Sequence, residues 1–180
     1  WNAHQFHAAT EFYSDFGVYD VRLTLPRRFV VGASGRQTAR TDNPDGTTTH
    51  HYHGEDIHDF AWTASPSFVD LSQRFEHATL PPVDIRLLLQ SERRGQADRY
   101  FAIVSATLKR YGEWFGAYPY GYITVVDPAF QSESDGMEYP TFLTGRSRWI
   151  TPSGSQVPEA TTAHEVGHQW WYAMVATNEF

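Results

Sequence analysis

His164, Glu165 and His168 form the pattern His-Glu-x-x-His within the run ATTAHEVGHQWWYAM, residues 160–174. On an α-helix the two histidines are four residues apart, so their rings project from the same face, one turn from each other. Two imidazoles placed in this way can bind one Zn²⁺ ion, with Zn–N distances of about 2.0–2.1 Å. Glu165 lies roughly 100° around the helix from His164, so it can reach a metal-bound water without being a ligand. The pattern therefore predicts a zinc site with a general base.

The residues around this pattern strengthen the metal interpretation over a helix that carries two histidines by chance. The bare pattern would arise in roughly 2–3% of shuffled sequences of this composition. Its neighbours between residues 160 and 175 are mostly apolar, which predicts a buried helix, and buried polar side chains need partners. Gly167 costs a helix about 1 kcal/mol relative to alanine, and a close approach of another backbone or of a substrate would explain it. Pro158 suits the first turn of the helix.

Composition narrows the class of protein. The 180 residues suit one or two domains. The net charge of −7 and the lack of a dense basic segment argue against nucleic-acid binding. There is no cysteine, so any zinc must be held by histidine and carboxylate. No apolar stretch approaches 18 residues, so we expect no membrane span, and no signal peptide is visible. Because the chain starts at Trp1 and stops at Phe180, we expect an internal piece of a longer protein. The oligomeric state stays open.

The first part of the chain indicates β-structure. Val21, Leu23 and Leu25 alternate with polar residues, which predicts a strand, and a short apolar run follows a turn at Pro26. We interpret Thr41–Gly54 as a turn-rich loop. Phe60–Leu71 predicts a strand region interrupted at a proline, Pro66.

Four histidines lie in or near the predicted loop, at positions 50, 51, 53 and 58. They could form a second metal site. Without a helical spacing or an evident carboxylate partner, a solvated loop is the favoured interpretation.

Pro81-Pro82 marks a boundary between a β-rich segment, residues 1–79, and a second segment, residues 80–180. After it, Ile85–Leu89 is apolar except for Arg86 and predicts a strand buried on both faces. Apolar side chains then recur at spacings of three and four, which predicts an amphipathic helix ended by Gly116 and Pro119; they are Phe101, Val104, Leu108, Tyr111 and Phe115.

The rest of the second segment completes an α+β module. Tyr122–Val126 is strand-like, and Met137–Leu143 predicts an edge strand because Pro140 cannot donate a hydrogen bond in a central one. The predicted order after Pro81 is therefore strand, helix, strand, strand, helix.

Two motifs together resemble the aminopeptidase N family of gluzincin zinc metallopeptidases, which includes many bacterial peptidases and is related to leukotriene hydrolases. One is HEVGHQWW, residues 164–171, where the family typically has His-Glu-x-x-His followed by Gln-Trp-Trp or Gln-Trp-Phe. The other is Gly136-Met137-Glu138, where the family has Gly-x-Met-Glu-Asn. Their order and separation agree with the family. Tyr19-Asp20-Val21 also resembles a strand pattern of its bacterial members.

The resemblance implies both a fold and an activity. Residues 1–79 would be the C-terminal part of a β-rich N-terminal domain, and residues 80–180 the N-terminal half of a thermolysin-like catalytic domain. The activity would be zinc-dependent removal of the first residue from peptides with a free N-terminus. Glu138 would bind the α-ammonium group of the peptide, as a carboxylate placed near the zinc favours a cationic N-terminus. The backbones of Gly136 and Met137 would pair with the peptide as an added strand.

The resemblance also implies the roles of the zinc motif. His164 and His168 would bind the ion, and Glu165 would take a proton from the attacking water and pass it to the leaving amine. The third ligand in the family is a glutamate on the next helix, which we expect beyond Phe180. Asn178-Glu179 matches a pair that orients a ligating histidine.

The sequence departs from the family at two positions and leaves alternatives open. We call Gly136-Met137-Glu138 the upstream motif. Asp135 replaces the first glycine of the family pattern and Tyr139 replaces its asparagine, and we expect Tyr139 to close or reshape the pocket. Gln5 or Glu11 could add to the amine anchor. An endopeptidase or epoxide-type hydrolase on the same scaffold is one alternative, and an inactive relative that serves as a scaffold or binding module is another. Many bacterial relatives are exported, which favours a periplasmic or extracellular location.

Overall fold

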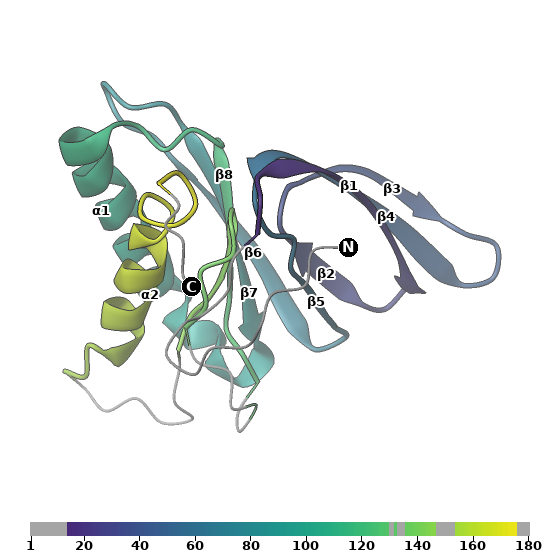
Figure 1. The fold of residues 1–180 in the computed structure, drawn as a ribbon. Helices are drawn as coiled ribbons and strands as arrows, with labels where there is room; N and C mark the ends of the chain where they lie inside the picture. The colour runs from purple at the N-terminus through teal and green to yellow at the C-terminus, as the bar shows by residue number, and fades with distance from the viewer. Residues whose placement is uncertain (1–13, 130–131, 133–135, 147–153, 176–180) are drawn as a thin grey trace, which may run out of the picture.

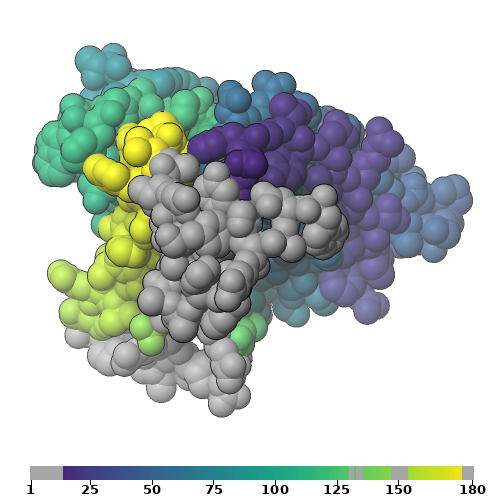
Figure 2. Space-filling model, in the orientation of Figure 1, coloured from purple at the N-terminus to yellow at the C-terminus, as the bar shows by residue number. Residues whose placement is uncertain are grey.

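The computed structural model describes residues 14–129, 132, 136–146 and 154–175, which form three layers. A four-stranded sheet lies in the middle, and two helices cover one of its faces, α1 (Ala97–Phe115) and α2 (Val157–Gly167) (Figure 1). Strands from the first part of the chain pack against the other face. In the space-filling view, the purple and blue N-terminal strands and the green and yellow helical part occupy opposite sides of the molecule (Figure 2). Helices and strands are thus mixed, as the predicted α+β class requires.

The middle sheet has the strand order β6-β7-β8-β9, with bounds Phe68–Phe75, Val83–Gln90, Tyr122–Val126 and Phe142–Thr144. β6 runs antiparallel to β7, and β7, β8 and β9 are parallel to one another. As predicted, β7 is buried on both faces. Leu87 and Leu89 belong to the core beneath the helices, whereas Leu88 packs with Val126 and Phe142 on the opposite face.

Arg86 is the charged residue in the middle of β7. Its side chain points toward the N-terminal strands, where Nη1 donates to the carbonyl of Val31 at 2.8 Å. The guanidinium also forms a two-pronged ion pair with Asp70 of β6, at 2.9 Å and 2.7 Å. These bonds offset part of the cost of placing a charge between two layers.

The predicted boundary at Pro81-Pro82 falls in the connection between β6 and β7. Because β6 precedes this connection and pairs along its whole length with β7, the middle sheet takes strands from both sides of residue 80. The assignment of 1–79 and 80–180 to separate domains stays a prediction.

α1 is the amphipathic helix predicted from the apolar spacing. It follows a short 3₁₀ helix, η1 (Ser91–Gln96), and ends at Phe115, before Gly116. Gly116 has φ of 106°, a conformation that favours glycine and ends the helix. Phe115 itself is exposed, while the buried face consists of Tyr100, Phe101, Val104, Thr107, Leu108 and Gly112.

α2 begins as predicted, with Pro158 in its first turn, but it is shorter than the predicted buried helix. It ends at Gly167, and the apolar residues that follow form turns. The chain folds back so that Ala173 donates to the carbonyl of His168 and Val175 to that of Trp170, both at 3.0 Å. The Trp170 indole reaches across the core and donates to the carbonyl of Gly116 at 2.9 Å. The predicted burial of this apolar flank holds for Trp170 and Ala173 but is wrong for Trp171 and Val175, which are exposed.

The edge strand of the second segment is also displaced from its prediction. β9 starts at Phe142 rather than at Met137, because a turn intervenes in which Phe142 donates to the carbonyl of Tyr139 at 2.9 Å. Met137 lies beside the strand through a single bridge to Thr144. The order strand, helix, strand, strand, helix after Pro81 is nevertheless confirmed. Within the described residues, no helix is long and apolar enough to cross a membrane.

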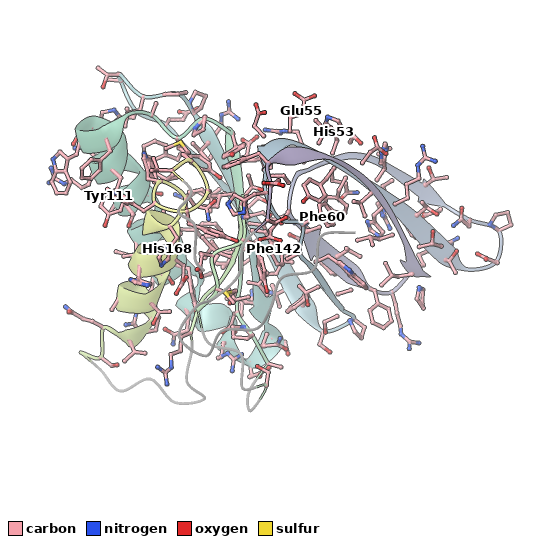
Figure 3. All side chains as sticks on the ribbon, viewed as in Figure 1. His53, Glu55, Phe60, Tyr111, Phe142 and His168 are labelled. Atoms are coloured by element: carbon pink, nitrogen blue, oxygen red, sulfur yellow. The ribbon has the colours of Figure 1, made fainter. Side chains whose placement is uncertain are left out.

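The α1 and α2 helices pack closely, and Figure 3 shows Tyr111 of α1 near the end of α2 that carries His168. A Cβ atom at Gly167 would lie 3.1 Å from the Tyr111 ring. Within the described residues, the close approach to this glycine comes from a side chain and not from another backbone.

The N-terminal strands form two small antiparallel sheets. One has the order β1-β4-β3, with bounds Gly17–Pro26, Thr47–Ile57 and Arg36–Asp42. The other pairs β2 (Val30–Ala33) with β5 (Trp62–Ser65). The predicted alternation in β1 is confirmed, since Val21, Leu23 and Leu25 are half-buried and their neighbours exposed. The predicted break at Pro66 is confirmed too, because β5 ends before it and β6 begins after it.

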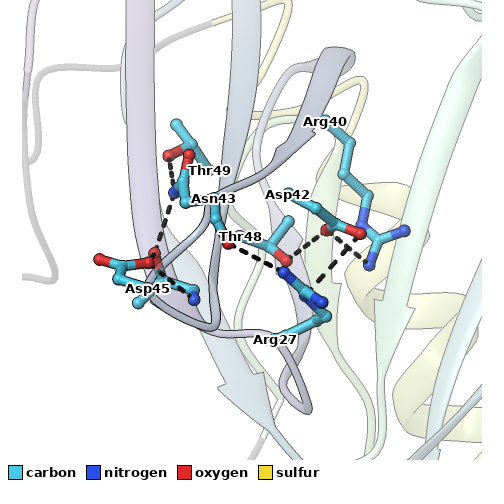
Figure 4. Close-up of polar contacts among 8 residues, drawn as sticks. Arg27, Arg40, Asp42, Asn43, Asp45, Thr48 and Thr49 are labelled. Atoms are coloured by element: carbon cyan, nitrogen blue, oxygen red, sulfur yellow. Dashed lines mark hydrogen bonds and ion pairs between the residues drawn. The ribbon is translucent and has the colours of Figure 1, made fainter.

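The prediction of a loop over Thr41–Gly54 is wrong. β3 and β4 form a hairpin there, and the turn takes only residues 43–46. Asn43 donates from Nδ2 to the hydroxyls of Thr47 and Thr49, and the Asp45 carboxylate accepts from Thr47 (Figure 4). The Asn-Pro-Asp-Gly signal belongs to this turn alone, and the β-branched threonines after it enter a strand paired on both sides.

Candidate active site

His164 and His168 present their Nε2 atoms to each other at a distance of 3.0 Å. Two nitrogen ligands about 2.05 Å from a tetrahedral zinc ion lie about 3.3 Å apart, so one small adjustment of the rings would admit the ion. His168 follows the last residue of α2 but keeps helical φ and ψ of −63° and −15°. The helical spacing therefore holds for this pair, although the helix has ended.

A backbone carbonyl fixes the second histidine. His168 Nδ1 lies 3.1 Å from the carbonyl oxygen of Trp171. Because a carbonyl can only accept, Nδ1 carries the hydrogen, and the neutral ring keeps its lone pair on Nε2. Ligating histidines are commonly oriented through their other nitrogen in this way. The turn that ends α2 early is what brings the Trp171 carbonyl under the ring.

Glu165 is buried, with 5% of its surface exposed, and lies directly against Gly136. A Cβ atom at position 136 would be 1.9 Å from Oε1 of Glu165. Glycine is therefore the residue that lets the upstream motif run this close to α2. The upstream motif has a glycine at this position in the sequence, and the contact with Glu165 explains why a glycine is needed there.

Glu138 is also buried, at 4% exposure. Glu138, Glu165 and His168 each offer a ligand atom within 4.8 Å of the others, and this is the one such group of three within the part of the chain that the structure describes. The two sequence motifs thus meet at one place. Two sets of groups converge there that could hold a cation, the histidine pair and this mixed group.

A cavity of about 480 Å³ opens beside these residues, lined by Gly136, Arg146, Ala160, Thr161, His164 and Glu165. Arg146 was not expected from the sequence. It lies just after β9, where nothing in the sequence pattern distinguishes it from other exposed arginines. It places a cation at the mouth of the site.

A second cavity, of about 660 Å³, lies on the other side of the upstream motif, between it and β5. Met137 and Tyr139 line this second cavity, and Gly136 lines both cavities. Tyr139, the departure from the family motif, therefore shapes a hollow adjacent to the candidate metal site.

Gln169 is the residue that sequence reasoning missed. It is fully buried and bonds to the backbone of the upstream motif at Glu138, Tyr139 and Thr141. A signal for it existed, because a polar residue between a metal ligand and a core tryptophan must find buried partners.

The four histidines of the first segment do not form the solvated loop that was predicted. His50, His51 and His53 lie on β4, and His58 follows its end. His50 and His58 are buried, whereas His51 and His53 are half-buried. His58 donates from Nε2 to the carbonyl of Tyr172 at 3.0 Å, which ties the N-terminal layer to the turn after α2.

The half-buried histidines, His51 and His53, pair with carboxylates. His51 Nε2 lies 2.6 Å from Asp20, and His53 Nε2 lies 3.0 Å from Glu55. The hydrogen bond from His51 lowers the pKa of the Asp20 carboxyl, and the hydrogen bond to Glu55 raises the pKa of His53. Figure 3 shows His53 and Glu55 at the outer surface, away from His168.

Some predicted residues lie outside the described residues. They are Gln5, Glu11, Asp135, Asn178 and Glu179.

No protein-family model matches the chain, and a search of curated proteins finds no match either.

Proposed function

We propose that the chain is part of a zinc-dependent aminopeptidase of the thermolysin-like gluzincin type, with the end of a β-rich domain preceding the first half of the catalytic domain. The observation that carries the proposal is the meeting of the two motifs. The Nε2 atoms of exposed His164 and half-buried His168 lie 3.0 Å apart, and His168 forms a group with the buried carboxylates of Glu165 and Glu138. A pair of histidines that only stabilised the fold would need neither buried carboxylate.

The residues fit a zinc ion. Two imidazole nitrogens at near-ligand separation, one of them with its tautomer fixed by a carbonyl, are the nitrogen donors that zinc prefers. When bound, the ion would supply a Lewis acid that polarises the scissile carbonyl and acidifies the attacking water. His164 and His168 would hold it, with a carboxylate from beyond Phe180 as the third ligand.

Glu165 serves as the general base. Its carboxylate lies against Gly136, and Glu165 lines the same cavity as His164. It takes a proton from the attacking water and gives that proton to the amine that leaves. This role requires Glu165 to remain outside the metal's ligand set.

Glu138 anchors the substrate's α-ammonium group. The buried Glu138 carboxylate lies beside a candidate cation site. It favours a positively charged group of the substrate at short range, and the free N-terminus of a peptide supplies such a group. Both backbone groups of Met137 already pair with Thr144, at 3.4 Å and 2.8 Å. Of the two residues predicted to pair with the peptide backbone, the proposal therefore retains only Gly136.

Metal analysis of the full-length protein tests the zinc site. We expect one zinc per chain, lost in both His164→Ala and His168→Ala, with activity removed by a chelator and restored by zinc. His77→Ala is the matched control, because His77 lies in the turn between β6 and β7 and should leave the zinc content unchanged. Zinc retained by both ligand variants would refute the assignment.

A further inference from the structure

Gln169 joins the two motifs of the candidate site through one buried amide. Its Oε1 accepts from the backbone N–H of Thr141 at 2.8 Å. Its Nε2 lies 3.3 Å and 3.2 Å from the carbonyls of Glu138 and Tyr139 and donates to both. The residue before it is His168. One side chain therefore spans from the metal ligand to the backbone of the proposed amine anchor.

The segment that Gln169 holds contains a backbone conformation that is unusual for its residue. Thr141 has φ of 62°, in the left-handed region that a β-branched residue rarely adopts. Its N–H is held by Gln169, and its Oγ1 accepts from the N–H of Gly35 at 2.9 Å. The turn is thus fixed on one side by Gln169, which follows α2, and on the other by Gly35, which lies between β2 and β3.

Both ends of the Gln169 amide are needed. The carbonyl oxygen meets a donor and the NH₂ group meets two acceptors, so a carboxylate or an apolar side chain of the same size would leave buried backbone groups unpaired. The Glu138 side chain stems from the same residue whose carbonyl Gln169 holds. A displacement of this backbone moves the Glu138 carboxylate relative to His168.

We propose that Gln169 is a positioning residue that sets the distance between the amine-anchoring carboxylate of Glu138 and the metal held by His168, and thereby fixes the requirement for a free N-terminus. The inference rests on the proposed function and adds to it the residue on which the selectivity depends.

The test compares Gln169→Leu and Gln169→Glu with a matched control, Thr162→Val, in the full-length protein. Thr162 is a fully buried polar residue of α2 whose hydroxyl has no hydrogen-bond partner within the described residues. For each variant, zinc content, kcat and KM are measured on an aminoacyl-arylamide and on its N-acetylated form.

We expect both Gln169 variants to keep their zinc while the preference for the free amine, as the ratio of kcat/KM values, falls at least about tenfold. The loss should appear in KM for the free amine, since a misplaced anchor weakens substrate binding. Thr162→Val should keep the preference. An unchanged preference in the Gln169 variants would overturn the proposal and leave the residue a structural one.

A crystal structure of Gln169→Leu decides the question even if the parent protein proves inactive, in which case the proposed function fails first. We expect Glu138 to move away from His168 by comparison with the parent. An unchanged separation between these two residues would contradict the positioning role, whatever the activity.

Discussion

Gly136 and Glu165 are in contact so close that no side chain fits between them: a Cβ atom at position 136 would lie 1.9 Å from Oε1 of Glu165. The upstream motif and the zinc motif are therefore matched in shape at this point. The proposed general base, Glu165, packs against the backbone of Gly136.

Gly136→Ala should reduce kcat by about a hundredfold, because the added methyl group must displace either the Glu165 carboxylate or the segment that carries Glu138. Steady-state kinetics on an aminoacyl-arylamide measures the effect. Gly95→Ala is the control, since a Cβ atom there meets nothing within 4 Å. Equal activity of the two variants would show that the contact does not matter for the reaction.

Glu165→Gln should lower kcat by roughly 10²–10⁴-fold, the usual contribution of a general base, and leave zinc binding intact. Kinetics and metal analysis of the same preparation separate the two effects. Glu165 also belongs to the mixed group with Glu138 and His168. Loss of zinc in this variant would make Glu165 a ligand and refute its role as the base.

Tyr172→Phe should destabilise the protein by about 1–3 kcal/mol, because the Tyr172 hydroxyl donates to the Asp59 carboxylate at 2.7 Å. Burial, and then this hydrogen bond, raise the pKa of Tyr172, so the hydroxyl stays protonated at ordinary pH. The free energy of unfolding measures the loss. Tyr120→Phe removes a hydroxyl that donates to a neutral carbonyl, that of Asp56, and should cost less, about 0.5–1.5 kcal/mol. The reverse order of these two losses would contradict the account.

Arg99→Met should remove a pH-dependent part of the stability. Arg99 donates to both carboxylate oxygens of Glu159 at the start of α2, and this pairing lowers the Glu159 pKa. The contribution is present above the unfolded pKa of about 4.3 and disappears as the pH falls through the lower folded value.

The difference in unfolding free energy between parent and Arg99→Met should be roughly 0.5–1 kcal/mol at pH 7 and should shrink toward pH 3. Arg110→Met is the control, because the ion pair that Arg110 makes within the described residues is a 3.8 Å contact with Glu113 at the surface, and its loss should change stability little. A difference in unfolding free energy that grows toward low pH would contradict the predicted direction of the pH dependence.

Local patterns predicted those elements whose own residues determine them. The alternation of Val21, Leu23 and Leu25 and the apolar spacing of α1 each describe one buried face, so the strand and the helix could be derived without knowing their neighbours. The β3-β4 hairpin could not be derived in this way, because the residues of β4 are mostly polar and the strand is stabilised by pairing with β1 and β3 on its two sides. The turn signal in its sequence is real, but the predicted loop extends over more residues than the turn of residues 43–46 occupies.

The candidate site shows the same division. His164, Glu165 and His168 could be singled out because one helical turn fixes their relation, and Gly136 and Glu138 because a second motif had the expected spacing. The end of α2 at Gly167 could not be predicted, since it depends on Trp170 reaching the Gly116 carbonyl across the core. The roles of Gln169 and of the Trp171 carbonyl follow from that turn and were missed with it.

The most direct test of the central claim is hydrolysis of aminoacyl-arylamides by the full-length protein, each compared with its N-acetylated form, with and without a zinc chelator. We predict cleavage of the free-amine substrates alone, abolished by the chelator. Cleavage of the acetylated substrates would keep the zinc chemistry but contradict the aminopeptidase assignment and the role of Glu138. No cleavage of any substrate would contradict the enzymatic account and favour a scaffold or binding protein.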